Sequence, residues 1–66
     1  MSKLAEAILY FLQQETNKGK KSFIALDLEL AGKISNSLAL KIIQELEENG
    51  YIEVHREWVS GSFNLI

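Results

Sequence analysis

The stretch NSLALKIIQELEENGYI, residues 36–52, decides how this chain folds. At about 100° per residue its apolar side chains gather on one face of a helix, namely Ala39, Ile42, Ile43 and Leu46. The opposite face carries polar and charged side chains, namely Ser37, Lys41, Gln44 and Glu48. Asn49-Gly50 is typical of a helix end, because glycine adopts the left-handed conformation that stops a helix. The pattern predicts an amphipathic helix that is capped by Ser35 or Asn36, runs to Asn49 and is followed by a strand.

Two further helices are expected before this stretch. Ser2 is a good N-cap for a first helix, which should fade near Thr16 and Asn17 because residues 18–21, Lys-Gly-Lys-Lys, have the composition of a loop. The segment at residues 22–26 is short and apolar, so it is expected to form either a brief strand or an extended lead-in to the second helix. Asp27 is expected to cap a short second helix that ends near Lys33 or Ile34.

The last part of the chain, residues 51–66, has the pattern of a β-hairpin. A turn at Ser60-Gly61 would give the cross-strand pairs Val59–Ser62, Trp58–Phe63 and Arg56–Leu65. In that register one face of the hairpin is apolar, and it comprises Ile52, Val54, Trp58, Phe63 and Leu65. Arg56 breaks the pattern, and an ion pair with Glu53 or Glu57 is expected for it.

The segment from Asn36 to Ile52 resembles the third helix and the start of the wing in winged helix-turn-helix transcriptional regulators. In those families a capped recognition helix ends in leucine, here Leu46, then a few polar residues, a glycine and two apolar residues that open the wing. The likeness extends over roughly residues 22–66. It implies an α+β fold with three helices, a C-terminal β-hairpin wing and a possible short strand after the first helix, in one domain over residues 1–66.

The resemblance also implies a function, which is binding of double-stranded DNA with the helix at about residues 36–49 in the major groove. That helix carries short hydrogen-bonding groups near its N-terminus and longer ones a turn further on, which gives the candidate contacts Asn36, Ser37, Leu40, Lys41 and Gln44. Phosphate contacts are expected from outside the helix, at Lys33, Lys20, Lys21, Ser60 and Ser62. The alternative is an ordinary solvated face, on which Lys41 pairs with Glu45.

Composition narrows the class of protein. The 66 residues include no cysteine and no proline, which excludes a disulfide framework and a thiolate metal site. Hydrophobic residues make up 47% and charged residues 24%, as in an ordinary globular domain rather than a disordered chain. No targeting or membrane-spanning segment is expected, so the cytoplasm is the default compartment. A core this small favours a homodimer.

The formal net charge of −2 argues against a polybasic protein, but the charge is unevenly distributed. Residues 1–41 hold six lysines and four acids, which gives +2. Residues 42–66 hold Arg56 against five glutamates, which gives −4. The acids are therefore expected at the far end of the third helix and the root of the wing, where they would point out of the DNA groove.

No catalytic, metal or cofactor site is expected. His55 is the only histidine, and without cysteines or a carboxylate cluster around it neither a zinc site nor a catalytic base is indicated. Trp58 and Phe63 could stack on single-stranded nucleic acid, but a cross-strand pair in the core is the favoured interpretation.

The sequence thus favours a small transcriptional regulator that binds double-stranded DNA as a homodimer. The alternative is a protein–protein interaction module of the same fold without DNA-binding activity. Its partner would contact Leu40, the exposed part of the first helix or the acidic root of the wing.

Overall fold

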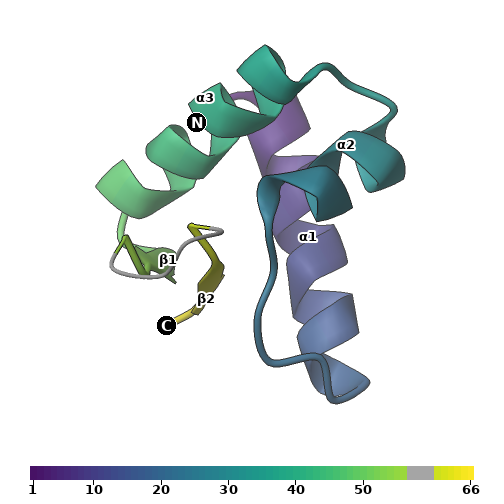
Figure 1. Ribbon diagram of the computed structural model, residues 1–66, viewed down its shortest axis with the longest axis vertical. Coiled ribbons are helices and arrows are strands. Elements are labelled where there is room, and N and C mark those ends of the chain that lie inside the picture. Colours follow the sequence, from purple (N-terminus) through teal and green to yellow (C-terminus); the bar gives the residue numbers. More distant parts are fainter. Residues whose placement is uncertain (57–60) are drawn as a thin grey trace.

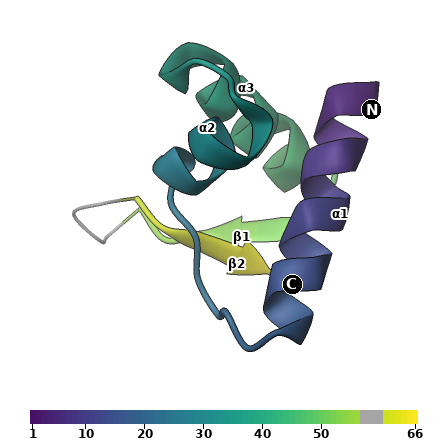
Figure 2. The same cartoon turned by 90° about the vertical axis from the view of Figure 1, so that its right-hand side faces the viewer.

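The computed structural model of the protein describes residues 1–56 and 61–66. In this part of the chain the helices are α1 (Lys3–Asn17), α2 (Ala25–Gly32) and α3 (Asn36–Glu48), and the strands are β1 (Ile52–Val54) and β2 (Phe63–Leu65). The strands form an antiparallel sheet, so the predicted α+β class is confirmed. Figures 1 and 2 show α2 and α3 together at one end of the molecule and the two strands below α3.

The ends of α1 and α3 agree with the sequence. The Ser2 hydroxyl accepts a hydrogen bond from the Ala5 N–H at 3.1 Å, and the Ser35 hydroxyl accepts one from the Leu38 N–H at 3.2 Å. Each hydroxyl satisfies a donor that the first turn of a helix leaves unpaired. After α3 the chain turns at Gly50, whose φ is +80°. Both predicted N-caps and the predicted glycine stop are confirmed.

The start of α2 differs from the expectation. The helix begins at Ala25, and the cap position is taken by Ile24, which has no side-chain acceptor. The carboxylate of Asp27 reaches back instead and accepts a hydrogen bond from the Ile24 N–H at 2.8 Å. The prediction that Asp27 is the N-cap is therefore wrong. Asp27 lies in the first turn of α2, where its negative charge interacts favourably with the positive end of the helix dipole.

Each of the helices and strands contributes to one hydrophobic core. The α3 residues predicted to face inward, Ala39, Ile42, Ile43 and Leu46, are all buried, so the predicted inner face of α3 is confirmed. In the described residues, the cluster of buried apolar side chains comprises Ala5, Ile8, Leu9, Leu12, Phe23, Leu28, Ala39, Ile42, Ile43, Leu46, Ile52 and Phe63.

Phe23 links the segment before α2 to β2. Its N–H donates to the Phe63 carbonyl and its carbonyl accepts from the Phe63 N–H, both at 2.8 Å. The two rings stack with their centroids 5.8 Å apart, and both side chains are buried. Residues 22–26 were expected to form a brief strand or an extended lead-in. Phe23 makes a single antiparallel bridge, and Ala25 and Leu26 already belong to α2.

The register of the hairpin differs from the prediction. Phe63 lies opposite Val54, four residues before the expected Trp58, and Leu65 lies opposite Ile52 rather than Arg56. The predicted register is wrong, although Ile52 and Phe63 are buried as expected. Because side chains alternate along a strand with period two, a shift of four residues leaves the same residues on the apolar face. The expected turn residue Ser60 and the paired residues Trp58 and Val59 lie outside the described residues.

Lys33, which follows α2, has a left-handed backbone with φ 52° and ψ 49°. This conformation crowds any side chain with a Cβ, so we expect Lys33→Gly to raise the free energy of unfolding by about 1 kcal/mol. Urea denaturation measures the change. Lys33→Ala is the matched control, because it removes the same charge and keeps the strain. Equal stabilities of the two variants would contradict the prediction.

Candidate nucleic-acid interface

The outer face of α3 presents Ser37, Lys41 and Gln44 to solvent. At about 1.5 Å of rise per residue these side chains span about 10 Å along one side of the helix. The opposite side of α3 is anchored by Ile42 and Leu46, which are 2% and 0% exposed. Because its inner side is packed in the core, α3 holds the side chains of its outer face in a fixed arrangement.

Lys41 makes no ion pair or hydrogen bond within residues 1–56 and 61–66. Glu45, the partner of Lys41 in the alternative interpretation, is hydrogen-bonded to Ser2 instead. Its carboxylate accepts from the backbone N–H of Ser2 at 2.7 Å and from the Ser2 hydroxyl at 3.2 Å. The Lys41–Glu45 pair of the alternative interpretation is therefore not formed, and Lys41 is exposed.

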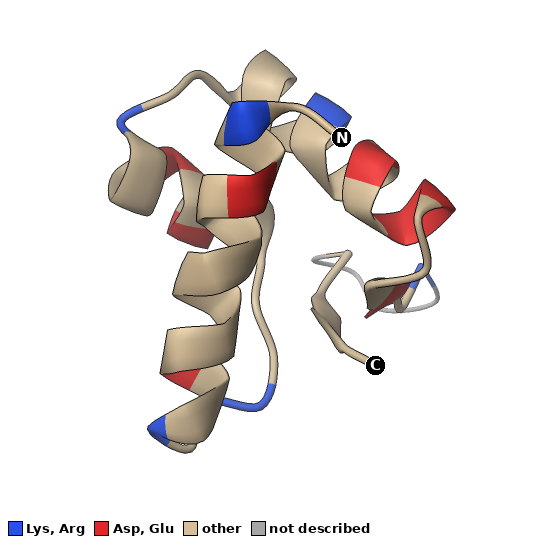
Figure 3. Ribbon diagram, turned by 180° about the vertical axis from the view of Figure 1, so that it is seen from behind, with Lys and Arg blue, Asp and Glu red and all other residues tan. Residues whose placement is uncertain are grey.

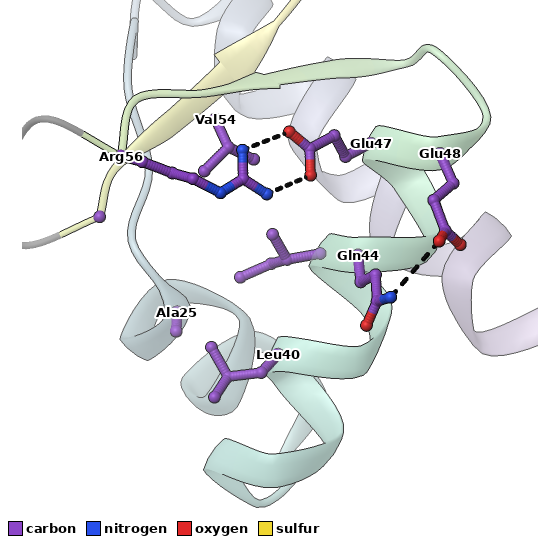
Figure 4. Close-up of a pocket in the computed structure, with 9 residues that line it drawn as sticks. Ala25, Leu40, Gln44, Glu47, Glu48, Val54 and Arg56 are labelled. Carbon is purple, nitrogen blue, oxygen red and sulfur yellow. Dashed lines mark hydrogen bonds and ion pairs between the residues drawn. The ribbon is translucent and has the colours of Figure 1, made fainter.

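Two other predicted contacts are already hydrogen-bonded. The side-chain amide of Asn36 donates to the Glu29 carboxylate of α2 at 3.0 Å. The amide of Gln44 donates to Glu48, one turn further along α3, at 3.3 Å (Figure 4). Asn36, Gln44 and Glu48 are exposed, so water or a ligand can replace either bond at small cost. The hydrogen bond of Asn36 therefore links α3 to α2, whereas that of Gln44 lies within α3.

Leu40 lies beside this face and is 52% exposed. It borders a groove of about 530 Å³ between α3, the start of α2 and the hairpin (Figure 4). The apolar lining of the groove is Ala25, Leu40, Ile43 and Val54. Its polar lining includes Gln44, Glu47, Glu48 and Arg56. The groove meets the outer face of α3 at Gln44, which belongs to both, and at Leu40, which lies beside that face.

An ion pair joins α3 to the end of β1 at one edge of the groove. The Arg56 guanidinium donates to both carboxylate oxygens of Glu47, at 2.6 and 2.7 Å. These bonds lower the pKa of Glu47 below its ordinary value of 4.5, and they raise the pKa of Arg56. The expectation that Arg56 pairs with Glu53 is wrong, because Arg56 lies beyond the end of β1, across from α3, and binds Glu47 instead. Glu57, the other expected partner, lies outside the described residues.

The lysines outside α3 do not form one surface with it. Lys33 is exposed in the turn just before α3, as expected. Lys20 pairs with Asp27 at 3.6 Å and also lies 5.5 Å from the centre of the Phe23 ring. Figures 1 and 2 show the loop between α1 and α2, which carries Lys20 and Lys21, at the opposite end of the molecule from the start of α3. The structure therefore brings Lys33, but not Lys20 and Lys21, close to α3.

The hairpin residues also differ from the expectation. Ser62 is 4% exposed, and its carbonyl accepts a hydrogen bond from the His55 N–H at 2.8 Å. Its hydroxyl has no hydrogen-bond partner among the described residues. Ser62, which was expected to contact phosphate, is buried instead, because the pairing of the two strands extends beyond β1 and β2 to His55 and Ser62. Ser60 is outside the described residues. The ring of His55 contacts Asn64 and lies 3.9 Å from Glu53.

Acidic residues gather along the C-terminal half of α3, as Figure 3 shows, at Glu45, Glu47 and Glu48. Lys41 precedes them on the same helix. In the described residues no group of three or more histidine, cysteine, aspartate or glutamate residues is arranged to hold a metal ion. Those residues also form no helix that is long and apolar enough to cross a membrane.

Sequence reasoning missed the groove and the Arg56–Glu47 pair. Both depend on the hairpin register, which the sequence did not determine. The one sequence signal was Arg56 itself, because it breaks the apolar alternation of the hairpin. Comparison with protein families, with curated proteins and with solved structures finds no match to the chain.

The Arg56–Glu47 pair predicts a pH dependence of stability. Because the pKa of Glu47 is lowered on folding, its contribution is present above the unfolded value of 4.5 and is lost as the pH falls through the folded value. We expect Arg56→Gln to destabilise the protein slightly at pH 7 and not at all at about pH 2. Urea denaturation at the two pH values measures this, with Lys21→Gln as the surface control, because Lys21 is exposed and makes no ion pair within residues 1–56 and 61–66. A loss of equal size at both pH values would contradict the prediction.

Proposed function

We propose that the protein binds double-stranded DNA through α3 and acts as a small transcriptional regulator with a winged-helix arrangement. The observation that carries the proposal is the outer face of α3, where Ser37, Lys41 and Gln44 are exposed and Lys41 has no ion pair in the described residues. The order of three helices followed by an antiparallel hairpin supports the same proposal, since a recognition helix followed by a wing has that order.

Each of these side chains has a distinct task in the proposal. Gln44 exchanges its exposed bond with Glu48 for a bidentate pair of bonds with adenine, which is the favoured partner of an amide. Lys41 reaches a guanine edge or a phosphate, and Ser37, at the N-terminal end of α3, contacts the sugar–phosphate backbone. Lys33, in the turn before α3, adds a further phosphate contact.

The number of available cations limits how tightly one copy can bind. Lys33 and Lys41 are the cations that lie next to the start of α3 or on its outer face. Each phosphate contact releases counterions, so a protein with few contacts binds weakly and with a shallow dependence on salt. We therefore propose a homodimer, whose two copies occupy half-sites about one helical turn of DNA apart.

The proposed interface predicts the effect of single substitutions on DNA binding. We expect Gln44→Ala to cost about 1–3 kcal/mol on a preferred sequence, and Lys41→Ala to weaken binding of all sequences and flatten the salt dependence. Fluorescence anisotropy with duplex DNA between about 50 and 200 mM salt measures both effects. Circular dichroism checks that the variants fold.

Lys18→Ala is the control for that experiment, because Lys18 is bound to Glu15 at 3.3 Å, in the last turn of α1. Removing Lys18 should leave DNA binding almost unchanged. An absence of wild-type binding at low salt would refute the proposed function. If the wild type binds and both α3 variants bind equally well, a different face of the protein contacts DNA.

The proposed homodimer predicts that α1 contributes to self-association. Tyr10 is 64% exposed on α1, although it is a large aromatic residue, so burial against a second copy would stabilise a dimer. We expect a dimer at tens of micromolar protein by analytical ultracentrifugation, and a monomer for Tyr10→Glu. Gln13→Glu is the matched control on the exposed surface of α1. A wild-type monomer at millimolar concentration would contradict the prediction.

A further inference from the structure

The groove between α3 and the hairpin is a separate candidate for binding. It lies where the apolar side chains of Leu40, Ile43 and Val54 meet Ala25 from the start of α2. Its volume of about 530 Å³ falls in the range of about 300–1,000 Å³ that is usual for protein binding sites. Leu40 is 52% exposed although it is aliphatic, so an occupant that covers it removes apolar surface from water.

The charges on the lining of the groove select the kind of occupant. Glu47 and Glu48 lie on the α3 side, and Arg56 is the one cation that lines the groove in the described residues. Arg56 is bound to Glu47, whereas the described partner of Glu48 is the neutral amide of Gln44. Figure 4 shows Glu48 at the edge of the groove with its carboxylate beside Gln44. Among the described residues that line the groove, the negative charge of Glu48 is therefore uncompensated, which favours a cationic group and disfavours phosphate or another anion.

The exposure of the walls favours a peptide over an enclosed small molecule. A small ligand is usually buried over most of its surface, whereas Leu40, Gln44, Glu48 and Arg56 are all exposed walls. A peptide segment needs only to place one side chain against the apolar lining and a second one against the carboxylate. We propose that this groove binds a peptide segment of a protein partner in which a large aliphatic residue stands beside a lysine or arginine.

A titration with designed peptides tests the proposal. The probe is a short acetylated peptide that contains Leu-Arg-Ser-Leu, and matched peptides carry glutamate in place of arginine or serine in place of both leucines. Amide shifts of the ¹⁵N-labelled protein report the site. We expect saturable shifts at the groove residues Ala25, Ile43, Val54 and Gly61 with the first peptide, and weaker or absent shifts with the other two.

Variants of the protein separate the two features of the groove. We expect Leu40→Ser to weaken peptide binding about five- to tenfold, because it removes apolar contact at an exposed position where the fold does not depend on it. Glu48→Gln should weaken binding about two- to fivefold at low salt. Glu6→Gln, which removes an equally exposed carboxylate from α1, is the control and should have no effect.

The outcomes that overturn the proposal are definite. The first is an absence of saturable shifts at millimolar peptide. The second is that the glutamate peptide binds as tightly as the arginine peptide, and the third is that Glu48→Gln and Glu6→Gln bind the peptide with the same affinity. The proposal does not depend on the DNA-binding function, so duplex DNA is titrated into the same labelled protein. If DNA binds and the peptide does not, only the groove proposal fails; if the peptide binds and DNA does not, only the proposed function fails.

Discussion

The reciprocal backbone bonds between Phe23 and Phe63 are the constraint on which the rest of the structure depends. Each strand of the hairpin is only three residues long, and a two-stranded hairpin of that size is marginally stable in water by itself. Phe23 adds a second backbone partner to β2, on the side away from β1, with both bonds at 2.8 Å. Its ring stacks on that of Phe63 in the core, and such a pair adds about 0.5–1.5 kcal/mol beyond its buried area. The bridge therefore fastens the C-terminal strand to the chain between α1 and α2.

This bridge also determines where the functional surfaces lie. Ala25 follows Phe23 by two residues and begins α2, so fixing Phe23 on β2 holds the start of α2 close to the hairpin. Phe63 in turn pairs with Val54, which packs against the core next to α3. The groove between α2, α3 and β1 is thus a direct consequence of the bridge. The same placement carries Arg56 within reach of Glu47, and this ion pair joins the hairpin to the helix that we propose reads DNA.

Local patterns allowed the helices to be predicted, whereas pairing between distant segments did not follow from them. The inner face of α3, its Ser35 cap and the Gly50 stop depend on residues close in sequence, and all three are confirmed. The hairpin register is not local: a shift of four residues keeps Ile52 and Phe63 on the same face, so the alternation fits both registers. The errors at Ser62 and Arg56 follow from that ambiguity. On the predicted DNA surface, the exposure of Ser37, Lys41 and Gln44 could be predicted from helical periodicity. The bond from Asn36 to Glu29 and the distance of Lys20 and Lys21 from α3 required the tertiary structure.

The two proposed ligands would compete for the same residues. Gln44 belongs to the outer face of α3 and also lines the groove, and Leu40 lies between the two. A peptide that covers Leu40 would lie against Gln44, and DNA in contact with Gln44 would bring phosphates toward Glu47 and Glu48. The charges are unevenly distributed around this helix: Lys33 before α3 and Lys41 in its first half favour an anion, and the carboxylates of its second half favour a cation. Because Gln44 would contact either ligand, the two proposals imply that DNA and the peptide exclude one another. Binding of a basic peptide partner would thus release DNA without any change in the fold.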